Sequence, residues 1–323
     1  MTAADSASSL DLLRTMRLVR EAELRLAQLF ADGEVPGFIH LSVGQEGVAA
    51  GVCAALEPAD TLASNHRGHG HALAKGLDLD RFFLEIMGRA EGMCKGRGGS
   101  MHVADASVGM LGANGIVGAG LPIAVGSALA HQVKKSGAVA AVFFGDGALA
   151  EGVMHESFNL AAIWRLPVLF VCENNGWSEF SPTSRQLAAT PTALAESHKI
   201  IARSVDGNDV VAVHEAARAL VAAIRDGGGP RFLECRTTRV RGHFEGDPQK
   251  YRDSADAARS DDDPIGRLER RLAAEGVPAS DIESAAREAV ARVDAAVARA
   301  RSGTAPEFGA ALRDVYAEAG AAP

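Results

Sequence analysis

The sequence predicts an α/β protein with a mostly parallel sheet flanked by helices and a helical C-terminal tail. Two short, continuously apolar runs, residues 138–144 and 167–172, are typical of buried parallel strands, and residues 149–164 between them have helical periodicity. Toward the C-terminus, charged and apolar residues follow a helical pattern without any strand-like run. We therefore expect one α/β domain over residues 1–259 and a helical extension over residues 260–323 that packs on the same body.

The composition is that of an ordinary globular chain of 323 residues, of which 47% are hydrophobic. Its net charge of -8 argues against a nucleic acid as the main partner, because such binding depends on clustered Lys and Arg. No apolar run approaches the length of a membrane-spanning helix, and the N-terminus lacks the charged-then-apolar layout of a secretion signal. We expect a cytoplasmic protein without a membrane partner.

The N-terminal third predicts helices followed by a loop. Residues 9–32 place apolar side chains at helical spacing and end at Gly33, which indicates an amphipathic helix with a glycine end. A second helix is expected to follow Glu46. Residues 92–120 are rich in glycine, so this stretch predicts a loop where the backbone can approach a ligand closely.

The two apolar runs and the helix between them form a βαβ unit in the middle of the chain. A right-handed crossover makes the two strands parallel, so their carboxyl ends open on the same edge of the sheet. Residues 200–205 and 232–240 predict two further strands, with a helix at about 210–225 between them.

Polar residues follow both strands of this unit. Asp146, between Gly145 and Gly147, ends the first strand, and Asn174 and Asn175 end the second. A carboxylate and an amide oxygen are therefore expected in one crevice, beside the N-terminus of a helix that we expect to begin just after Gly147. Carboxylate, amide and main-chain oxygens suit Mg²⁺ or Ca²⁺, and helix N-termini favour anions. The pattern predicts a site for a metal-bound diphosphate.

Two other interpretations compete with this one. An Asp-Gly dipeptide by itself usually marks a turn, and only the second polar element, one strand-helix-strand step later, favours a site. Gly118-Ala119-Gly120 could open a dinucleotide-binding fingerprint, but Ile123 stands where a third small residue is needed and no convincing strand precedes it. A nicotinamide site is therefore disfavoured.

The spacing of the Gly-Asp-Gly and Asn-Asn elements resembles the binding motif of thiamine diphosphate enzymes. Over about residues 10–320, further motifs occur in the order seen in the α subunits of E1 components of 2-oxo acid and acetoin dehydrogenase complexes. These motifs are GFIHLSVGQE (37–46), HRGHG (66–70), GRGGSMH (96–102), GANGIVGAG (112–120) and RVRGHFEGDP (239–248). The resemblance implies the thiamine diphosphate-binding fold.

The resemblance also implies how the cofactor and its metal are held. Mg²⁺ would be bound by Asp146, Asn175 and the main-chain carbonyl of Trp177. Arg67 would contact the diphosphate, for which its planar guanidinium is suited. His66 stands where many relatives carry Tyr. The cofactor-binding positions carried over in this way are His66, Arg67, Gly115, Val117, Asp146, Gly147, Ala148 and Asn175.

Three histidines in these motifs are candidates for proton movement near neutral pH. His40 and His243 match histidines that relatives use to bind substrate and to steer acyl transfer, and His69 is a third candidate. For each of them a hydrogen-bonded packing role is the alternative. Phe244 stands where mitochondrial pyruvate dehydrogenase α chains carry a phosphorylatable serine, so phosphorylation at that point cannot occur here.

The resemblance implies partners and a substrate class. In this fold class the glutamate that activates thiamine diphosphate lies in a second α/β domain, for which we find no room in this chain. A separate β subunit, an α₂β₂ heterotetramer and a lipoyl-bearing E2 acyltransferase are therefore expected. The motifs are most similar to acetoin dehydrogenase α chains, which cleave acetoin and pass the two-carbon acyl unit to a lipoyl carrier or a dye. Pyruvate or branched-chain 2-oxo acid dehydrogenases and two-subunit carboligases remain alternatives.

Overall fold

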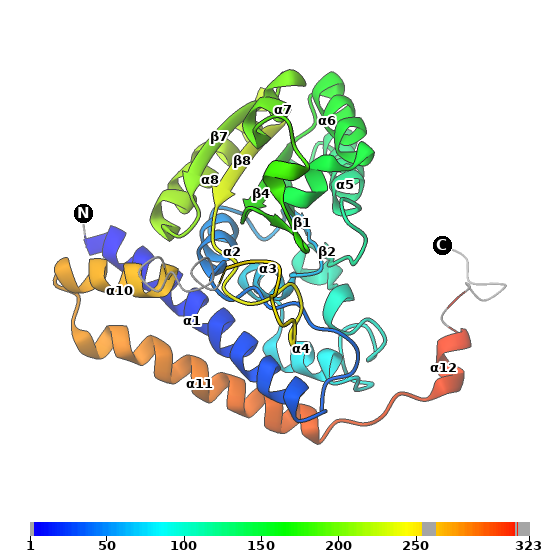
Figure 1. The fold of residues 1–323 in the computed structure, drawn as a ribbon, viewed down its shortest axis with the longest axis vertical. Helices are drawn as coiled ribbons and strands as arrows, with labels where there is room; N and C mark the ends of the chain where they lie inside the picture. Colours follow the sequence, from blue (N-terminus) through cyan, green and yellow to red (C-terminus); the bar gives the residue numbers. More distant parts are fainter. Residues whose placement is uncertain (1–2, 254–262, 314, 316–323) are drawn as a thin grey trace.

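The computed structural model describes residues 3–253, 263–313 and 315. Its centre is a six-stranded, all-parallel sheet with the strand order β2-β1-β3-β4-β8-β7 (Figure 1). The strands are β1 (Thr61–Ala63), β2 (Met110–Gly112), β3 (Ala140–Gly145), β4 (Val168–Asn174), β7 (Ile201–Asp206) and β8 (Arg231–Arg236). The predicted fold class, a mostly parallel sheet flanked by helices, is confirmed.

Helices cover both faces of this sheet, and a short antiparallel pair, β5 (Trp177–Ser178) and β6 (Ser181–Pro182), follows β4. The helices are α1 (Ala3–Ala31), α2 (Glu46–Cys53), α3 (His69–Lys75), α4 (Leu79–Ile86), α5 (Gly120–Lys134), α6 (Gly152–Trp164), α7 (Pro191–Ser197), α8 (Val210–Ala223), α10 (Pro264–Ala274), α11 (Ala279–Arg301) and α12 (Phe308–Arg313). None of the helices in the described part of the chain combines the length and hydropathy of a bilayer-spanning segment.

The central strands are apolar throughout because both of their faces are buried. Phe143 of β3 packs into a core with α1, α2, α4 and α8, whereas its neighbour Phe144 packs on the other face with α5 and α6. Both side chains are at most 2% exposed. This two-sided burial explains why the sequence shows continuous apolar runs instead of the alternation of a one-sided sheet.

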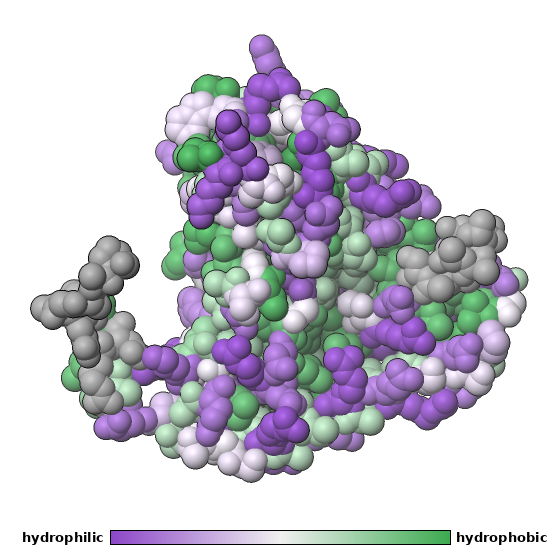
Figure 2. All heavy atoms as spheres, turned by 180° about the vertical axis from the view of Figure 1, so that it is seen from behind, coloured by the Kyte–Doolittle hydropathy of each residue, from purple (hydrophilic) through white to green (hydrophobic). Residues whose placement is uncertain are grey.

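The C-terminal helices α10 and α11 lie against the N-terminal helix α1 (Figure 1). Leu13 and Met16 of α1 pack with Ile265 and Leu268 of α10, and Val293 of α11 joins the main core. The expected domain boundary at residue 259 lies outside the described residues, so the division into two domains stays a prediction. In Figure 1, α12 stands away from the body, and the face shown in Figure 2 mixes hydrophilic and hydrophobic residues.

Several elements differ from the sequence prediction. The last predicted strand ends at Arg236, short of residue 240, and the helix expected just after Gly147 is preceded by a 3₁₀ turn, Asp146–Ala150, so that α6 starts at Gly152. Strands β1 and β2 were not predicted because each has only three residues. Helix α5 was also missed, since it starts at a glycine and its N-cap residue makes no side-chain capping bond.

Candidate active site

A cavity of about 280 Å³ opens at the carboxyl ends of β3 and β4. This is the edge where ligands bind in open α/β sheets. All of the predicted site residues except His69 line it: His40, His66, Arg67, Gly115, Val117, Asp146, Gly147, Ala148, Asn175, Trp177 and His243. Residues from six separate motifs of the sequence thus meet in one cavity.

Asp146 and Asn175 follow neighbouring strands. β3 pairs directly and in parallel with β4, and Gly145 lies opposite Glu173 in the register. The predicted arrangement, an acidic and an amide side chain carried to the same edge by adjacent parallel strands, is therefore confirmed.

The carboxylate of Asp146 is buried, and only one of its two oxygens has a hydrogen-bond partner among the described residues. Asp146 is 1% exposed, and its Oδ2 accepts a hydrogen bond from Thr183 Oγ1. Oδ1 has no hydrogen-bond partner among the described residues. Burial raises the pKa of Asp146 to about 6, against the lowering effect of the bond from Thr183 and of the nearby backbone N–H groups of Asp146 and Asn175. A buried carboxylate oxygen without a donor fits a cation.

The other two predicted metal ligands, Asn175 and Trp177, line the same cavity as Asp146. Asn175 Oδ1 accepts a hydrogen bond from the Trp177 backbone N–H at 3.1 Å, which keeps one lone pair free, and Asn175 Nδ2 donates to Gln45 Oε1 at 3.1 Å. Gly147 allows the β5–β6 hairpin to approach, because a Cβ there would lie 2.5 Å from Ser178 Oγ. Within the described residues, no three His, Cys, Asp or Glu side chains cluster as a metal site.

Two buried arginines give the cavity positive charge. Arg67 donates to the carbonyl oxygens of Leu41 and His243, both at 2.8 Å. Burial lowers the pKa of Arg67 to about 10, so this guanidinium stays protonated at neutral pH. Arg239, which the sequence analysis did not single out, is 2% exposed and donates to Tyr251 Oη at 2.8 Å. The charge of both groups favours an anion in the cavity.

His40, His66 and His243 form a cluster in the cavity wall. Their ring centroids are separated by 4.8 Å (His40 to His66), 5.1 Å (His40 to His243) and 5.2 Å (His66 to His243). Burial, assisted by the charge of Arg67, lowers the pKa of His40 to about 4 and that of His243 to about 3, and holds the pKa of His66 well below its ordinary value. The three imidazoles are therefore neutral at neutral pH. Each neutral ring can donate one hydrogen bond and accept another.

His69 is not among the residues that line the cavity. It is fully buried, with Nδ1 3.0 Å from Glu23 Oε2 and Nε2 2.8 Å from Ser100 Oγ. Burial acts to raise the pKa of Glu23, but the interactions with His69 and Ser42 outweigh it and the pKa is lowered. Through these two contacts His69 ties α1 to Ser100 of the glycine-rich loop, and the residue after Ser100, Met101, lines the cavity.

The cavity also contains residues that the sequence analysis missed. Gln45 and Arg239 belong to the quoted motifs GFIHLSVGQE and RVRGHFEGDP, so their place in those motifs was the available signal. Glu173 directly precedes the Asn-Asn element and is 2% exposed. Its Oε1 lies 3.1 Å from His71 Nε2. A position at the end of a buried strand was its only signal.

Comparisons with known proteins identify the family of this chain. The family described as "Dehydrogenase E1 component" matches residues 14–308. The α subunit of acetoin:2,6-dichlorophenolindophenol oxidoreductase from Bacillus subtilis (strain 168) is 44% identical over 310 residues, which cover 92% of this chain and 90% of the relative. The subunit of the same name from Cupriavidus necator is 43% identical over 97% of this chain and 95% of the relative.

The α subunit of the pyruvate dehydrogenase E1 component from Zymomonas mobilis is 42% identical over 86% of this chain and 80% of its own length. The matches to these subunits cover most of the chain, and the family match over residues 14–308 includes every motif that lines the cavity. This chain therefore belongs to the dehydrogenase E1 component family of oxidoreductases, and membership in that family implies thiamine diphosphate as the cofactor.

Proposed function

We propose that this chain is the α subunit of a thiamine diphosphate-dependent acetoin oxidoreductase. The observation that carries the proposal is the similarity, over nearly the full length of both chains, to two acetoin:2,6-dichlorophenolindophenol oxidoreductase α subunits. An α subunit of a pyruvate dehydrogenase E1 component is the second candidate, because the Zymomonas mobilis relative is nearly as similar over a smaller share of the chain.

The cofactor's diphosphate would be held through Mg²⁺ by Asp146, Asn175 and the carbonyl oxygen of Trp177. The unpartnered Oδ1 of buried Asp146 supports this assignment, as do three oxygen donors of the type that Mg²⁺ prefers. Positive charge from Arg67 would stabilise the diphosphate. The remaining cofactor contacts would come from the side chain of His66 and from the backbone at Gly115, Val117, Gly147 and Ala148.

Thiamine diphosphate, when bound, supplies the carbanion chemistry, and the protein's task is to orient the substrate and hold protons. His40 and His243 suit this task because their rings are neutral at neutral pH and face the same cavity. We assign them to binding the hydroxyl and carbonyl oxygens of the substrate and to moving its hydroxyl proton. His69, which does not line the cavity, would act indirectly by holding Ser100.

We further propose a β-type partner subunit in an α₂β₂ heterotetramer, and a lipoyl-bearing E2 acyltransferase as the physiological acceptor. Exposed apolar side chains near the cavity support a partner that covers its mouth. Ile116, which lines the cavity, is 72% exposed, and Phe180, whose ring lies 6.2 Å from that of His243, is 47% exposed. Exposed apolar patches of this kind mark protein interfaces.

The proposal is tested by producing the chain together with its β-type partner and following dye reduction with acetoin, pyruvate or branched-chain 2-oxo acids. With acetoin, one water is consumed, acetaldehyde and acetate form, and two electrons and two protons pass to 2,6-dichlorophenolindophenol. We expect acetoin to give the highest kcat/KM. A higher kcat/KM with pyruvate, together with release of CO₂, would support the second candidate instead.

A further inference from the structure

The side chain of Gln45 lies against the side-chain amide of Asn175. Gln45 is 2% exposed and lines the cavity, and its Oε1 accepts a hydrogen bond from Asn175 Nδ2 at 3.1 Å. At the other end of the amide, Asn175 Oδ1 accepts from the Trp177 backbone N–H at 3.1 Å. With the Gln45 amide oriented as it is, a half-turn of the Asn175 amide would set Oδ1 against Gln45 Oε1 and Nδ2 against the Trp177 N–H, so both bonds would be lost.

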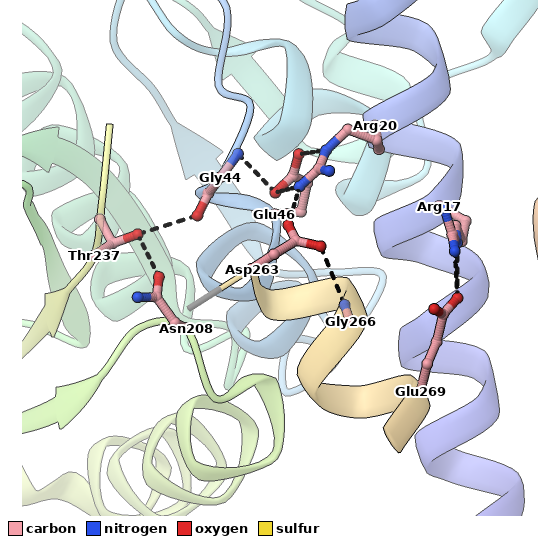
Figure 3. Close-up of polar contacts among 9 residues, drawn as sticks. All are labelled: Arg17, Arg20, Gly44, Glu46, Asn208, Thr237, Asp263, Gly266 and Glu269. Carbon is pink, nitrogen blue, oxygen red and sulfur yellow. Dashed lines mark hydrogen bonds and ion pairs between the residues drawn. The ribbon is translucent and has the colours of Figure 1, made fainter. Parts of the chain in front are cut away.

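The backbone that carries Gln45 is fixed on one side by the α/β body. Gly44 O accepts from Thr237 Oγ1 at 3.3 Å, and the same hydroxyl bonds to Asn208 Oδ1 at 3.1 Å (Figure 3). Gly44 has a φ of +94° and packs so closely that a Cβ there would lie 2.6 Å from Val240 Cγ2. The segment just before α2 is therefore pressed against the segment that follows β8.

On the other side, the same backbone is fixed by an ion-pair network. Glu46 is fully buried, and its Oε2 accepts from the Gly44 N–H at 2.9 Å and from Arg20 Nη2 at 3.0 Å. Arg20 also pairs with Asp263, whose Oδ2 caps α10 by accepting from the Gly266 N–H at 3.1 Å (Figure 3). Helices α1, α2 and α10 thus hold the residue before Gln45 and the residue after it.

We propose that Gln45 is a positioning residue that turns the oxygen of Asn175 toward the divalent cation of the cofactor site. This inference rests on the proposed Mg²⁺ assignment of Asp146 and Asn175. Gln45 acts through its acceptor oxygen: it makes no bond to the cation, and it sets the orientation of the ligand that does. Partners of metal ligands act in this way, and removing them typically lowers metal affinity by about 10- to 100-fold.

Two substitutions separate this role from simple packing. Gln45→Met keeps the length of the side chain but removes the acceptor, whereas Gln45→Glu keeps an acceptor and introduces a charge. Mg²⁺ affinity is measured by calorimetric titration of the full chain with thiamine diphosphate present, and folding is checked by thermal unfolding without ligand. We expect Gln45→Met to weaken Mg²⁺ binding about tenfold or more and Gln45→Glu to bind within about threefold of the unsubstituted chain.

A packing role predicts the reverse order, since methionine fills the same space and a buried charge does not fit. Gln45→Met with unchanged affinity, or Gln45→Glu as impaired as Gln45→Met, would overturn the inference while leaving the proposed function intact. Failure of the unsubstituted chain to bind thiamine diphosphate in a Mg²⁺-dependent way would overturn both.

A second measurement tests whether Gln45 acts through the orientation of the Asn175 amide. Asn175→Asp has two chemically equivalent oxygens, so its orientation no longer matters. In that background Gln45→Met is expected to change Mg²⁺ affinity by less than about threefold, and an undiminished loss in the double variant would contradict the inference. The comparison is a double-mutant cycle, which isolates the coupling between the two side chains.

Discussion

Replacing the Asp146 carboxylate by an amide should stabilise the metal-free chain while abolishing its response to Mg²⁺. Asn keeps the size of Asp and an oxygen that can accept from Thr183, but it removes a buried charge whose Oδ1 has no partner among the described residues. Function and stability are therefore expected to change in opposite directions. A residue that serves only the stability of the fold would not combine a loss of Mg²⁺ binding with a gain in stability when it is replaced.

The magnitude follows from the pKa of Asp146, which burial raises to about 6 from 3.8. At about 1.4 kcal/mol per pH unit, the metal-free folded state of the unsubstituted chain is destabilised by about 3 kcal/mol above pH 6. The direction of the pH dependence follows from the raised pKa of this carboxyl group in the folded state. Below pH 4 the group is protonated in both the folded and the unfolded state. Between pH 4 and 6 the unfolded state loses its proton first, so the free energy of unfolding falls as the pH rises.

The assay is denaturant unfolding of the unsubstituted chain and Asp146→Asn, without Mg²⁺, at pH 7.5 and pH 5. We expect Asp146→Asn to be more stable by up to about 3 kcal/mol at pH 7.5 and by less at pH 5. Asp105→Asn is the control: the hydrogen bond from Ser107 and the charge of Arg81 lower the pKa of Asp105, so its loss should not stabilise. An Asp146→Asn variant that is less stable than the unsubstituted chain at pH 7.5 would refute the reasoning.

Three further predictions follow from the structure. Burial lowers the pKa of His40 to about 4 and that of His243 to about 3, so in NMR titrations neither ring should gain a proton above pH 5. Because unfolding restores their ordinary pKa, the free energy of unfolding should fall as the pH drops below 6.5. Titration of either ring near pH 6.5 in the folded chain would show that burial does not act as described. The chain without a β-type partner should not reduce dye with acetoin and added cofactor, and any turnover would contradict the two-subunit proposal. Gly44→Ala should lower the free energy of unfolding by about 1–3 kcal/mol more than Gly33→Ala, because both residues have a positive φ but only a Cβ at Gly44 meets neighbouring atoms; equal costs in denaturant unfolding would refute the crowding at Gly44.

The part of the candidate site that lies at the ends of strands was predictable from the sequence. Continuous apolar runs identify β3 and β4, and adjacency of consecutive strands places Asp146 and Asn175 at one edge. The positions of His40 and His243 depend on loops, which no periodicity describes. Their place in the cavity could be expected only from the resemblance of their motifs to a known family, and their lowered pKa values only from burial in the folded chain.

The features that were missed depend on contacts between residues far apart in the chain. Strands β1 and β2 have three residues each, so their pairing within the sheet, and not a sequence pattern, defines them. His69 stands in the same motif as Arg67, yet its side chain bonds to Glu23 and Ser100 and does not line the cavity. The role of Gln45 likewise becomes visible only when Asn175, 130 positions away, lies against it.

The central claim is that Asp146 and Asn175 hold a divalent cation bound to a diphosphate at the ends of β3 and β4. The most direct test is anomalous diffraction from crystals grown with Mn²⁺ in place of Mg²⁺ and with thiamine diphosphate. We predict a single strong peak between Asp146, Asn175 and the Trp177 carbonyl oxygen, in contact with the cofactor's phosphates. Bound cofactor with the Mn²⁺ peak elsewhere, or with no peak at these three groups, would contradict the account.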